Sequence, residues 1–138
     1  MRRSIRGGLV LAGLCVALTA WACSTKDPFL IPTEPTNPIT EVFSGTLNQA
    51  GAVVHPFSAF GRGTVTLTLT GMDPVTTVGL NLGTWNGTSC FVAVANEAST
   101  AGTILTAKII GAGSVCIRVY DVGNVTDPVA YTLSVVHP

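Results

Sequence analysis

The sequence predicts an all-β protein, a jelly-roll-like antiparallel β-sandwich of about eight strands, and three observations favour this fold. The segment GTVTLTLT at residues 63–70 alternates apolar and polar side chains with the period of two that is typical of a half-buried strand. Similar runs recur at intervals of about 8–12 residues, with glycine-rich turns between them. No window carries the i, i+3, i+4, i+7 spacing of an amphipathic helix over a useful length.

The expected strands follow one another through the last hundred residues of the chain. Pro56 lies inside the second of them, and a proline has no N–H to donate to a neighbouring strand. We therefore expect this strand at the edge of a sheet or at a bulge. The expected strands cover residues 41–48, 53–60, 63–70, 76–82, 90–95, 103–110, 113–121 and 129–136.

Two of the expected strands show which side chains face the core. In residues 63–70, the pattern places the apolar side chains inward and the threonines outward. In residues 113–121, GSVCIRVYD, a β-branched apolar face alternates with Cys116, Arg118 and Tyr120. The predicted core-facing residues are Val65, Leu67, Leu69, Val115, Ile117 and Val119.

Cys90 and Cys116 are the two cysteines inside this expected domain, and we predict that they form a disulfide. A bridge between them closes a long loop, which would stabilise the fold by roughly 3 kcal/mol. Two isolated cysteines without a nearby histidine supply only half of a tetrahedral zinc site, so we do not expect a metal there. Export into an oxidising compartment, for which the N-terminal sequence argues below, makes this pairing plausible.

The first 22 residues have the pattern of a secretory signal peptide. Three arginines precede an uncharged apolar run at residues 7–20, and Ala20-Trp21-Ala22 matches a small-residue cleavage site. The apolar run is shorter than the roughly 20 residues that a transmembrane helix needs. We therefore expect an exported protein.

Cys23 follows the expected cleavage site directly and resembles the lipidated cysteine of bacterial lipoproteins. Cysteine parity supports lipidation. Cys15 leaves with the leader and Cys90 pairs with Cys116, so an exported chain without a lipid would expose Cys23 as an unpaired thiol. Lipidation predicts a membrane partner and a place at the bacterial cell envelope. The alternative is cleavage by an ordinary leader peptidase, which would release a soluble secreted protein.

Residues 23–39 are expected to form a tether in front of the domain at residues 40–138. Four of the chain's eight prolines lie here, among threonine, asparagine and glutamate, so the segment cannot sustain a helix. If Cys23 carries no lipid, a frayed N-terminus explains the segment equally well. The prolines are Pro28, Pro32, Pro35 and Pro38.

Charge argues against nucleic acid as a partner. Behind the expected leader the chain has four basic residues and seven acidic ones, so its formal net charge is −3. Phosphate backbones are bound by clustered lysine and arginine, and no such cluster occurs behind the expected leader.

The chain resembles the bacterial pre-peptidase C-terminal domain, a jelly-roll-like β-sandwich. The resemblance rests on VFSGTLN, on HPFSAFGRGTVTLTLTG, on VGLNLG and on the closing pattern GSVCIRVYDVG followed by YTLSVVHP. It covers nearly all of residues 40–138. The resemblance implies a non-catalytic module that accompanies secreted enzymes and takes part in secretion or in binding to substrates and surfaces.

The sequence offers little that predicts catalysis, a cofactor or a metal. His55 and His137 have no partner close in sequence, and neither G-x-S-x-G nor H-E-x-x-H occurs. Asp121 and Asp127 are the best local pair for calcium, although capping of a turn explains them more simply. We expect no enzyme and no cofactor.

Trp85 and Asn86 are the candidate ligand-binding residues. They lie in the glycine-rich segment GTWNGTS, where a tryptophan can stack on a sugar ring. Trp85 could instead fold over the open end of the core. The resulting prediction is a non-catalytic exported binding or structural module, with carbohydrate or an envelope protein as its partner. A soluble secreted module that binds carbohydrate or surfaces is the alternative.

Overall fold

The computed structural model describes residues 37–138, and this part of the chain is all β. The predicted leader, Cys23 and most of the predicted tether therefore lie outside the described residues. None of the described residues belongs to a helix with the length and apolar character needed to cross a bilayer. The eight strands are β1 (Ile39–Leu47), β2 (Ala52–Ala59), β3 (Gly63–Asp73), β4 (Val78–Trp85), β5 (Cys90–Ser99), β6 (Ile104–Ile109), β7 (Gly113–Tyr120) and β8 (Val129–His137).

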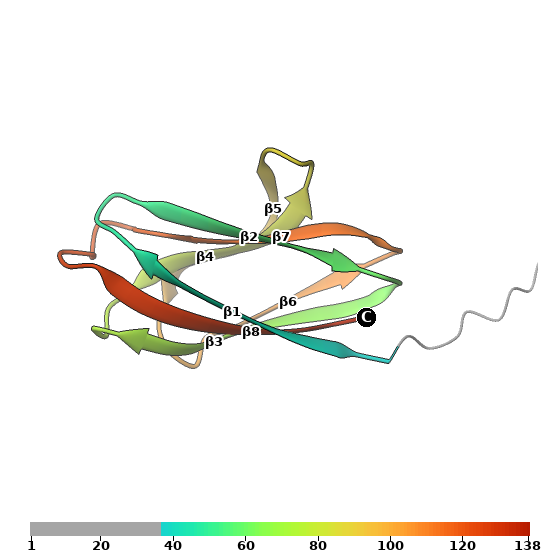
Figure 1. Cartoon of the computed structure of the whole chain (residues 1–138), viewed down its shortest axis with the longest axis horizontal. Helices are drawn as coiled ribbons and strands as arrows, with labels where there is room; N and C mark the ends of the chain where they lie inside the picture. Colours follow the sequence, from blue (N-terminus) through green and yellow to red (C-terminus); the bar gives the residue numbers. More distant parts are fainter. Residues whose placement is uncertain (1–36) are drawn as a thin grey trace, which may run out of the picture. The chain divides into compact units, whose positions relative to one another are not determined.

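The strands form two four-stranded antiparallel sheets, which are stacked face to face in Figure 1. Sheet A has the order β1-β8-β3-β6, and sheet B has the order β2-β7-β4-β5. Consecutive strands change sheet at every connection except the β4–β5 hairpin. This eight-stranded double-sheet arrangement is a jelly roll, which confirms the predicted fold class.

The core lies between the sheets and follows the predicted alternation of side chains. All six predicted core-facing residues of β3 and β7 are buried, because every second side chain of a strand points to the same face. Other strands contribute in the same way. The core also contains Leu47, Phe57, Val78, Leu80, Leu82, Leu105, Val129, Tyr131, Leu133 and Val135.

Strand β2 is an edge strand of sheet B, as Pro56 predicted. Its neighbour is β7, and Pro56 lies opposite Cys116 in the register. The side chains of His55 and Phe57 alternate with Pro56, and Phe57 is buried in the core. An edge strand tolerates a residue without an N–H, because no neighbouring strand on its outer side needs that hydrogen bond.

Strands β3 and β5 extend further than expected. Strand β3 continues to Asp73 because a register shift between Leu69 and Gly71 keeps it paired with β8. Strand β5 runs through Asn96 and Glu97 to Ser99, with two register shifts against β4. The polar residues interrupt the apolar pattern in the sequence, whereas the pairing with β4 continues past them.

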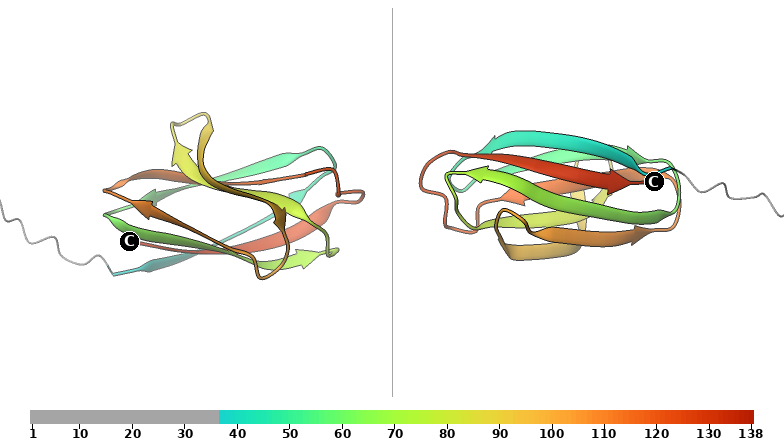
Figure 2. Two further views of the ribbon diagram at one scale, coloured as in Figure 1. Left: turned by 180° about the vertical axis from the view of Figure 1, so that it is seen from behind. Right: turned by 90° about the horizontal axis from the view of Figure 1, so that it is seen from below.

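The loops gather at two ends of the sandwich, which both views of Figure 2 show. We call the end where the described chain begins the proximal end. It contains Ile39, the β2–β3 loop at residues 60–62, the β6–β7 loop at residues 110–112 and Pro138. Ile39 pairs with His137, and the Phe60 N–H donates to the Pro138 carbonyl over 3.0 Å.

We call the opposite end the distal end. It contains the β1–β2, β3–β4, β5–β6 and β7–β8 connections. The Asp121 N–H donates to the Gly51 carbonyl over 3.0 Å, and the Thr76 hydroxyl donates to the Asn124 carbonyl over 3.1 Å. These hydrogen bonds link the β1–β2 and β3–β4 loops to the β7–β8 loop.

Candidate functional site: grooves beside the β4–β5 hairpin

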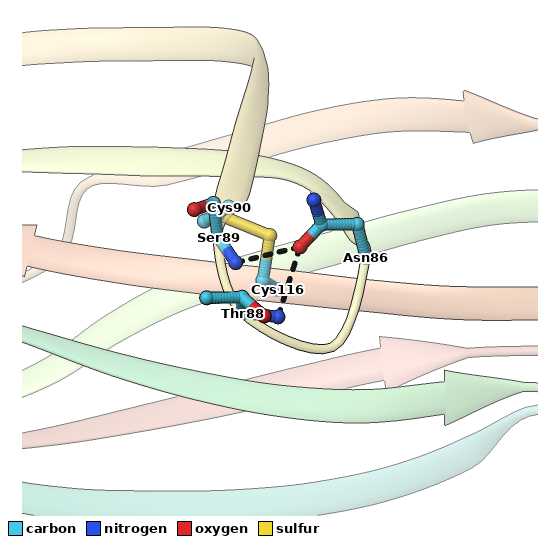
Figure 3. The surroundings of a disulfide bond; sticks show 5 residues. All are labelled: Asn86, Thr88, Ser89, Cys90 and Cys116. Carbon is cyan, nitrogen blue, oxygen red and sulfur yellow. Dashed lines mark hydrogen bonds between the residues drawn. A yellow bond between two sulfur atoms is a disulfide. The ribbon is translucent and has the colours of Figure 1, made fainter.

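The β4–β5 hairpin rises away from the rest of sheet B in Figure 1 and carries both predicted ligand-binding residues. Asn86 shapes its turn. The Oδ1 atom of Asn86 accepts the N–H groups of Thr88 and Ser89 at 2.9 and 2.7 Å, as Figure 3 shows. Gly87 has φ of +98°, a left-handed conformation that glycine adopts at low cost. The Asn86 side-chain oxygen is therefore engaged within its own loop.

A disulfide between Cys90 and Cys116 anchors this hairpin, which confirms the predicted pairing. The Sγ atoms are 2.07 Å apart, and the Cα atoms are 5.7 Å apart. Because the strand order is β7-β4-β5, the bridge connects β5 to β7 across the intervening strand β4. Gly83 of β4 lies opposite Cys116, and a side chain there would collide with the Phe91 carbonyl of β5. The absence of a side chain at Gly83 thus allows β5 to pack closely on β4.

Trp85 lines a groove of about 560 Å³ at the base of this hairpin. The indole is half-buried, so it is neither part of the closed core nor fully exposed. Asn86 does not line the groove. The other lining residues are Thr84 and residues 108–115.

A second groove of about 360 Å³ lies between the β2–β3 and β6–β7 loops at the proximal end. Residues 62–64 line one side, and residues 108–110 line the other. Lys108, Ile109 and Ile110 thus border both grooves. A smaller cavity of about 90 Å³, also lined by Lys108 and Ile109, reaches the core residues Val65 and Leu82.

The lining residues determine which ligands the first groove could bind. Trp85 supplies an aromatic face, Ile109 and Ile110 supply apolar surface, and Lys108 supplies a positive charge. The hydroxyl groups of Thr84 and Ser114 can donate and accept hydrogen bonds. Such a surface suits a ring with polar substituents or an anionic group. The role of Trp85 in ligand binding stays a prediction.

His55 lies between the two sheets rather than in a cleft with a serine. Its Nε2 atom is 2.8 Å from the Tyr131 hydroxyl, which lies on β8 of the other sheet. Burial lowers the pKa of His55, and burial also raises the pKa of Tyr131 to about 12. Gly45 of β1 leaves the space that the Tyr131 hydroxyl occupies. The pair therefore joins the sheets with both groups neutral at pH 7.

His137 is fully buried and meets an acidic residue that is distant in the sequence. Its Nε2 atom lies 2.9 Å from Glu41 Oε1, and its Nδ1 atom lies 3.2 Å from the Pro138 carbonyl oxygen. Local sequence patterns do not reveal this contact, because the β1–β8 pairing brings together residues 96 positions apart.

Asp121 caps the β7–β8 turn. Its Oδ1 atom accepts the N–H groups of Gly123, Asn124 and Val125, and its Oδ2 atom accepts the Ala50 N–H. These hydrogen bonds lower the pKa of Asp121, and the one from the Ala50 N–H has the largest effect. Of the two roles considered for Asp121, turn capping and calcium binding, the structure shows the capping contacts. Within residues 37–138, no three potential metal-ligating side chains gather into a group.

A polar cluster on the outer face of sheet B was not predicted. The guanidinium of Arg118 lies 5.0 Å from the centre of the Tyr120 ring, and burial followed by the Glu97 charge raises the pKa of Tyr120. Asn81, which faces Arg118 in the register, is 4% exposed. Among the buried side-chain polar atoms of the described residues, the Oδ1 atom of Asn81 is the one that lacks a hydrogen-bond partner.

In comparisons with known proteins, no family model and no curated sequence matches the chain. The resemblance to the pre-peptidase C-terminal domain therefore stays a prediction. The jelly-roll fold is compatible with that resemblance, but a fold of this kind hosts many unrelated functions.

Proposed function

We propose that this protein is an exported, non-catalytic binding and structural module held at the bacterial cell envelope by a lipid on Cys23. The leader pattern of residues 1–22 supports export, and the proline-rich segment behind Cys23 suits a spacer between a membrane and a folded domain. The domain has surface grooves, and its two histidines contact other residues of the domain, His55 with Tyr131 and His137 with Glu41.

The observation that carries this proposal is the Cys90–Cys116 disulfide. Structural disulfides persist in oxidising compartments such as the periplasm, which agrees with the leader. The bridge also takes both cysteines of the domain. Of the chain's four cysteines, this leaves Cys15 inside the expected leader and Cys23 at the expected new N-terminus. Attachment of a lipid to the sulfur of Cys23 would remove the thiol that is otherwise exposed.

Metabolic labelling with radioactive palmitate in a bacterial host tests the anchor. We expect label on the wild-type chain and on Cys15→Ala, which changes only the expected leader, and none on Cys23→Ala. The Cys23→Ala chain should move from the membrane fraction to the soluble periplasm or the medium. An unlabelled wild-type chain in the soluble fraction would refute the lipid anchor.

A soluble secreted module that binds carbohydrate is the second candidate, and the position of Trp85 favours it. The indole borders a groove that also contains a lysine and two hydroxyl groups, which suits a sugar ring with polar or charged substituents. In this form the protein would lack the lipid, and contact with a glycan would keep it at a surface.

A glycan array with purified protein tests this second candidate. We expect binding by the wild-type chain, a loss of about tenfold or more in affinity for Trp85→Ala, and no change for Phe91→Ala. Phe91 is the matched control because it is an exposed aromatic residue of the same hairpin that does not line the groove. No binding by any of the three chains would exclude the carbohydrate ligand.

A further inference from the structure

Charge is unevenly distributed between the two ends of the sandwich. Arg62 follows β2 and Lys108 lies near the end of β6, so two of the three cations of residues 37–138 lie at or near the proximal end. Asp121 and Asp127 lie in the β7–β8 connection and Asp73 ends β3, so three of the five acids lie at the distal end. Glu41, the acid near the proximal end, contacts His137.

Large apolar side chains are exposed at the same proximal end. Phe60 in the β2–β3 loop is 63% exposed, and Ile110 in the β6–β7 loop is 98% exposed. The second groove lies between these two loops, and Lys108 borders it. Figure 2 shows both loops at the end where the described chain begins. An apolar tip beside a cation is the composition that binds at a lipid–water interface.

The expected tether does not determine by itself which end of the domain faces a membrane. The sixteen residues from Cys23 to Pro38 can extend to about 55 Å. The eleven residues of β3 span about 35 Å, which approximates the length of the domain. A spacer of this reach would allow either end of the domain to face the membrane, so the charges and side chains at those ends decide the orientation.

We propose that the proximal end docks on the anionic headgroups of the membrane that holds the lipid anchor, with Phe60 and Ile110 inserted between the headgroups and Lys108 beside their phosphates. This inference rests on the proposed lipid anchor of Cys23. The anchor keeps the domain at a high effective concentration near the bilayer, so a weak contact is sufficient. The negative surface potential attracts the proximal end and repels the acidic distal end.

Docking in this orientation leaves the hairpin accessible. The Cys90–Cys116 disulfide holds the β4–β5 hairpin where it rises from sheet B, to the side of the proximal loops (Figures 1 and 2). The acidic distal end then faces away from the membrane. The orientation therefore decides which surfaces of the domain remain free for a partner.

The test supplies the anchor chemically. The chain without its leader, with the Cys90–Cys116 disulfide formed, is coupled through the Cys23 thiol to a maleimide lipid in nanodiscs that contain about 30% phosphatidylglycerol. A gadolinium-chelating lipid then broadens the amide NMR signals of residues near the headgroups. We expect the intensity loss at residues 60–62 and 110–112 to exceed that at residues 75–77 and 122–127 by about twofold or more.

Variants distinguish a specific contact from random tumbling. Phe60→Ser with Ile110→Ser should abolish the difference between the two ends, and Lys108→Gln or nanodiscs of phosphatidylcholine alone should reduce it. Val75→Ser is the matched control, because Val75 is 80% exposed at the distal end, and it should leave the difference unchanged. An unchanged amide spectrum without lipid verifies that each variant is folded.

Equal broadening at both ends, or stronger broadening at the distal end, would overturn the docking proposal. So would a difference that survives the Phe60→Ser and Ile110→Ser substitutions. Because the maleimide lipid replaces the natural anchor, this result does not depend on whether cells acylate Cys23. The palmitate experiment decides that question separately.

Discussion

Single residues hold the turns of this domain together over long distances in sequence. Asp121 of the β7–β8 turn accepts the N–H of Ala50, which lies in the β1–β2 turn 71 positions earlier. Ala50 has φ of +53°, a left-handed conformation that is costly for a residue other than glycine. The Asp121 carboxylate thus stabilises both its own turn and a strained neighbour.

We predict that Asp121→Asn lowers the melting temperature at pH 7. The folded-state pKa of Asp121 lies below its ordinary value of 3.8, so its carboxylate stabilises the fold above that pH. This stabilisation is lost as the pH falls through the lowered pKa. Thermal melts between about pH 2.5 and 7 should therefore show the wild-type and Asp121→Asn curves converging in acid. Asp127→Asn, with one side-chain contact of 3.3 Å to Thr126, should have a smaller effect.

His55 gives a second prediction about how stability depends on pH, over a different pH range. Burial lowers its folded-state pKa below 6.5, so the unfolded chain takes up a proton more readily. We expect the free energy of unfolding to fall as the pH drops below about 6.5 and to level off below the folded-state pKa. In urea titrations between about pH 8 and 5, His55→Gln should show a shallower decline. An equally steep decline in the variant would contradict this assignment.

At the scale of elements, two features position the β4–β5 hairpin. The Cys90–Cys116 bridge ties the edge strand β5 to β7, and Gly83 leaves room for the Phe91 carbonyl of β5. Both features act on β5, an edge strand that pairs with β4 on one side only.

We predict that Gly83→Ala destabilises the domain by about 1–3 kcal/mol. The added methyl group would meet the backbone of Phe91, which can move away only if β5 shifts. Gly71→Ala is the matched control, because the nearest atoms to its added methyl group belong to Thr132 at 3.9 Å. Urea unfolding of both variants measures the difference, and equal stability of the two would contradict the proposed crowding.

Removing the disulfide tests its contribution to the fold. We expect the double variant Cys90→Ala with Cys116→Ala to lose about 3 kcal/mol in free energy of unfolding, because the bridge closes a loop of 26 positions in the unfolded chain. Chemical reduction of the wild-type domain should produce a similar loss. A change below about 1 kcal/mol in urea titrations would show that the bridge contributes little to stability.

At the scale of the whole molecule, the jelly-roll connectivity makes the two sheets depend on each other. Every connection except the β4–β5 hairpin passes from one sheet to the other. Strand β8, the last in the chain, lies between β1 and β3, so sheet A is incomplete until the final strand pairs. Neither sheet consists of a continuous segment that could form on its own.

We therefore predict that the domain unfolds in one cooperative transition. Trp85 is the tryptophan within residues 37–138, and its fluorescence reports on the hairpin, whereas far-UV circular dichroism reports on all eight strands. The two signals should have the same urea midpoint. A hairpin that loosens first would separate the midpoints and contradict this prediction.

The sequence alone determined the fold class, the edge position of β2 and the inward faces of β3 and β7. These features depend on local chemistry: a period of two in apolar side chains, and a proline that lacks an N–H. It also predicted the Cys90–Cys116 pair, because the domain contains two cysteines behind a predicted export leader.

The tertiary structure alone decided which distant residues meet. The contacts of His137 with Glu41 and of His55 with Tyr131 depend on the order of strands in the sheets, which local patterning does not encode. The same holds for the full length of β5 and for the grooves around Lys108. Strand order follows from the packing of both sheets around one core, which is a property of the whole chain.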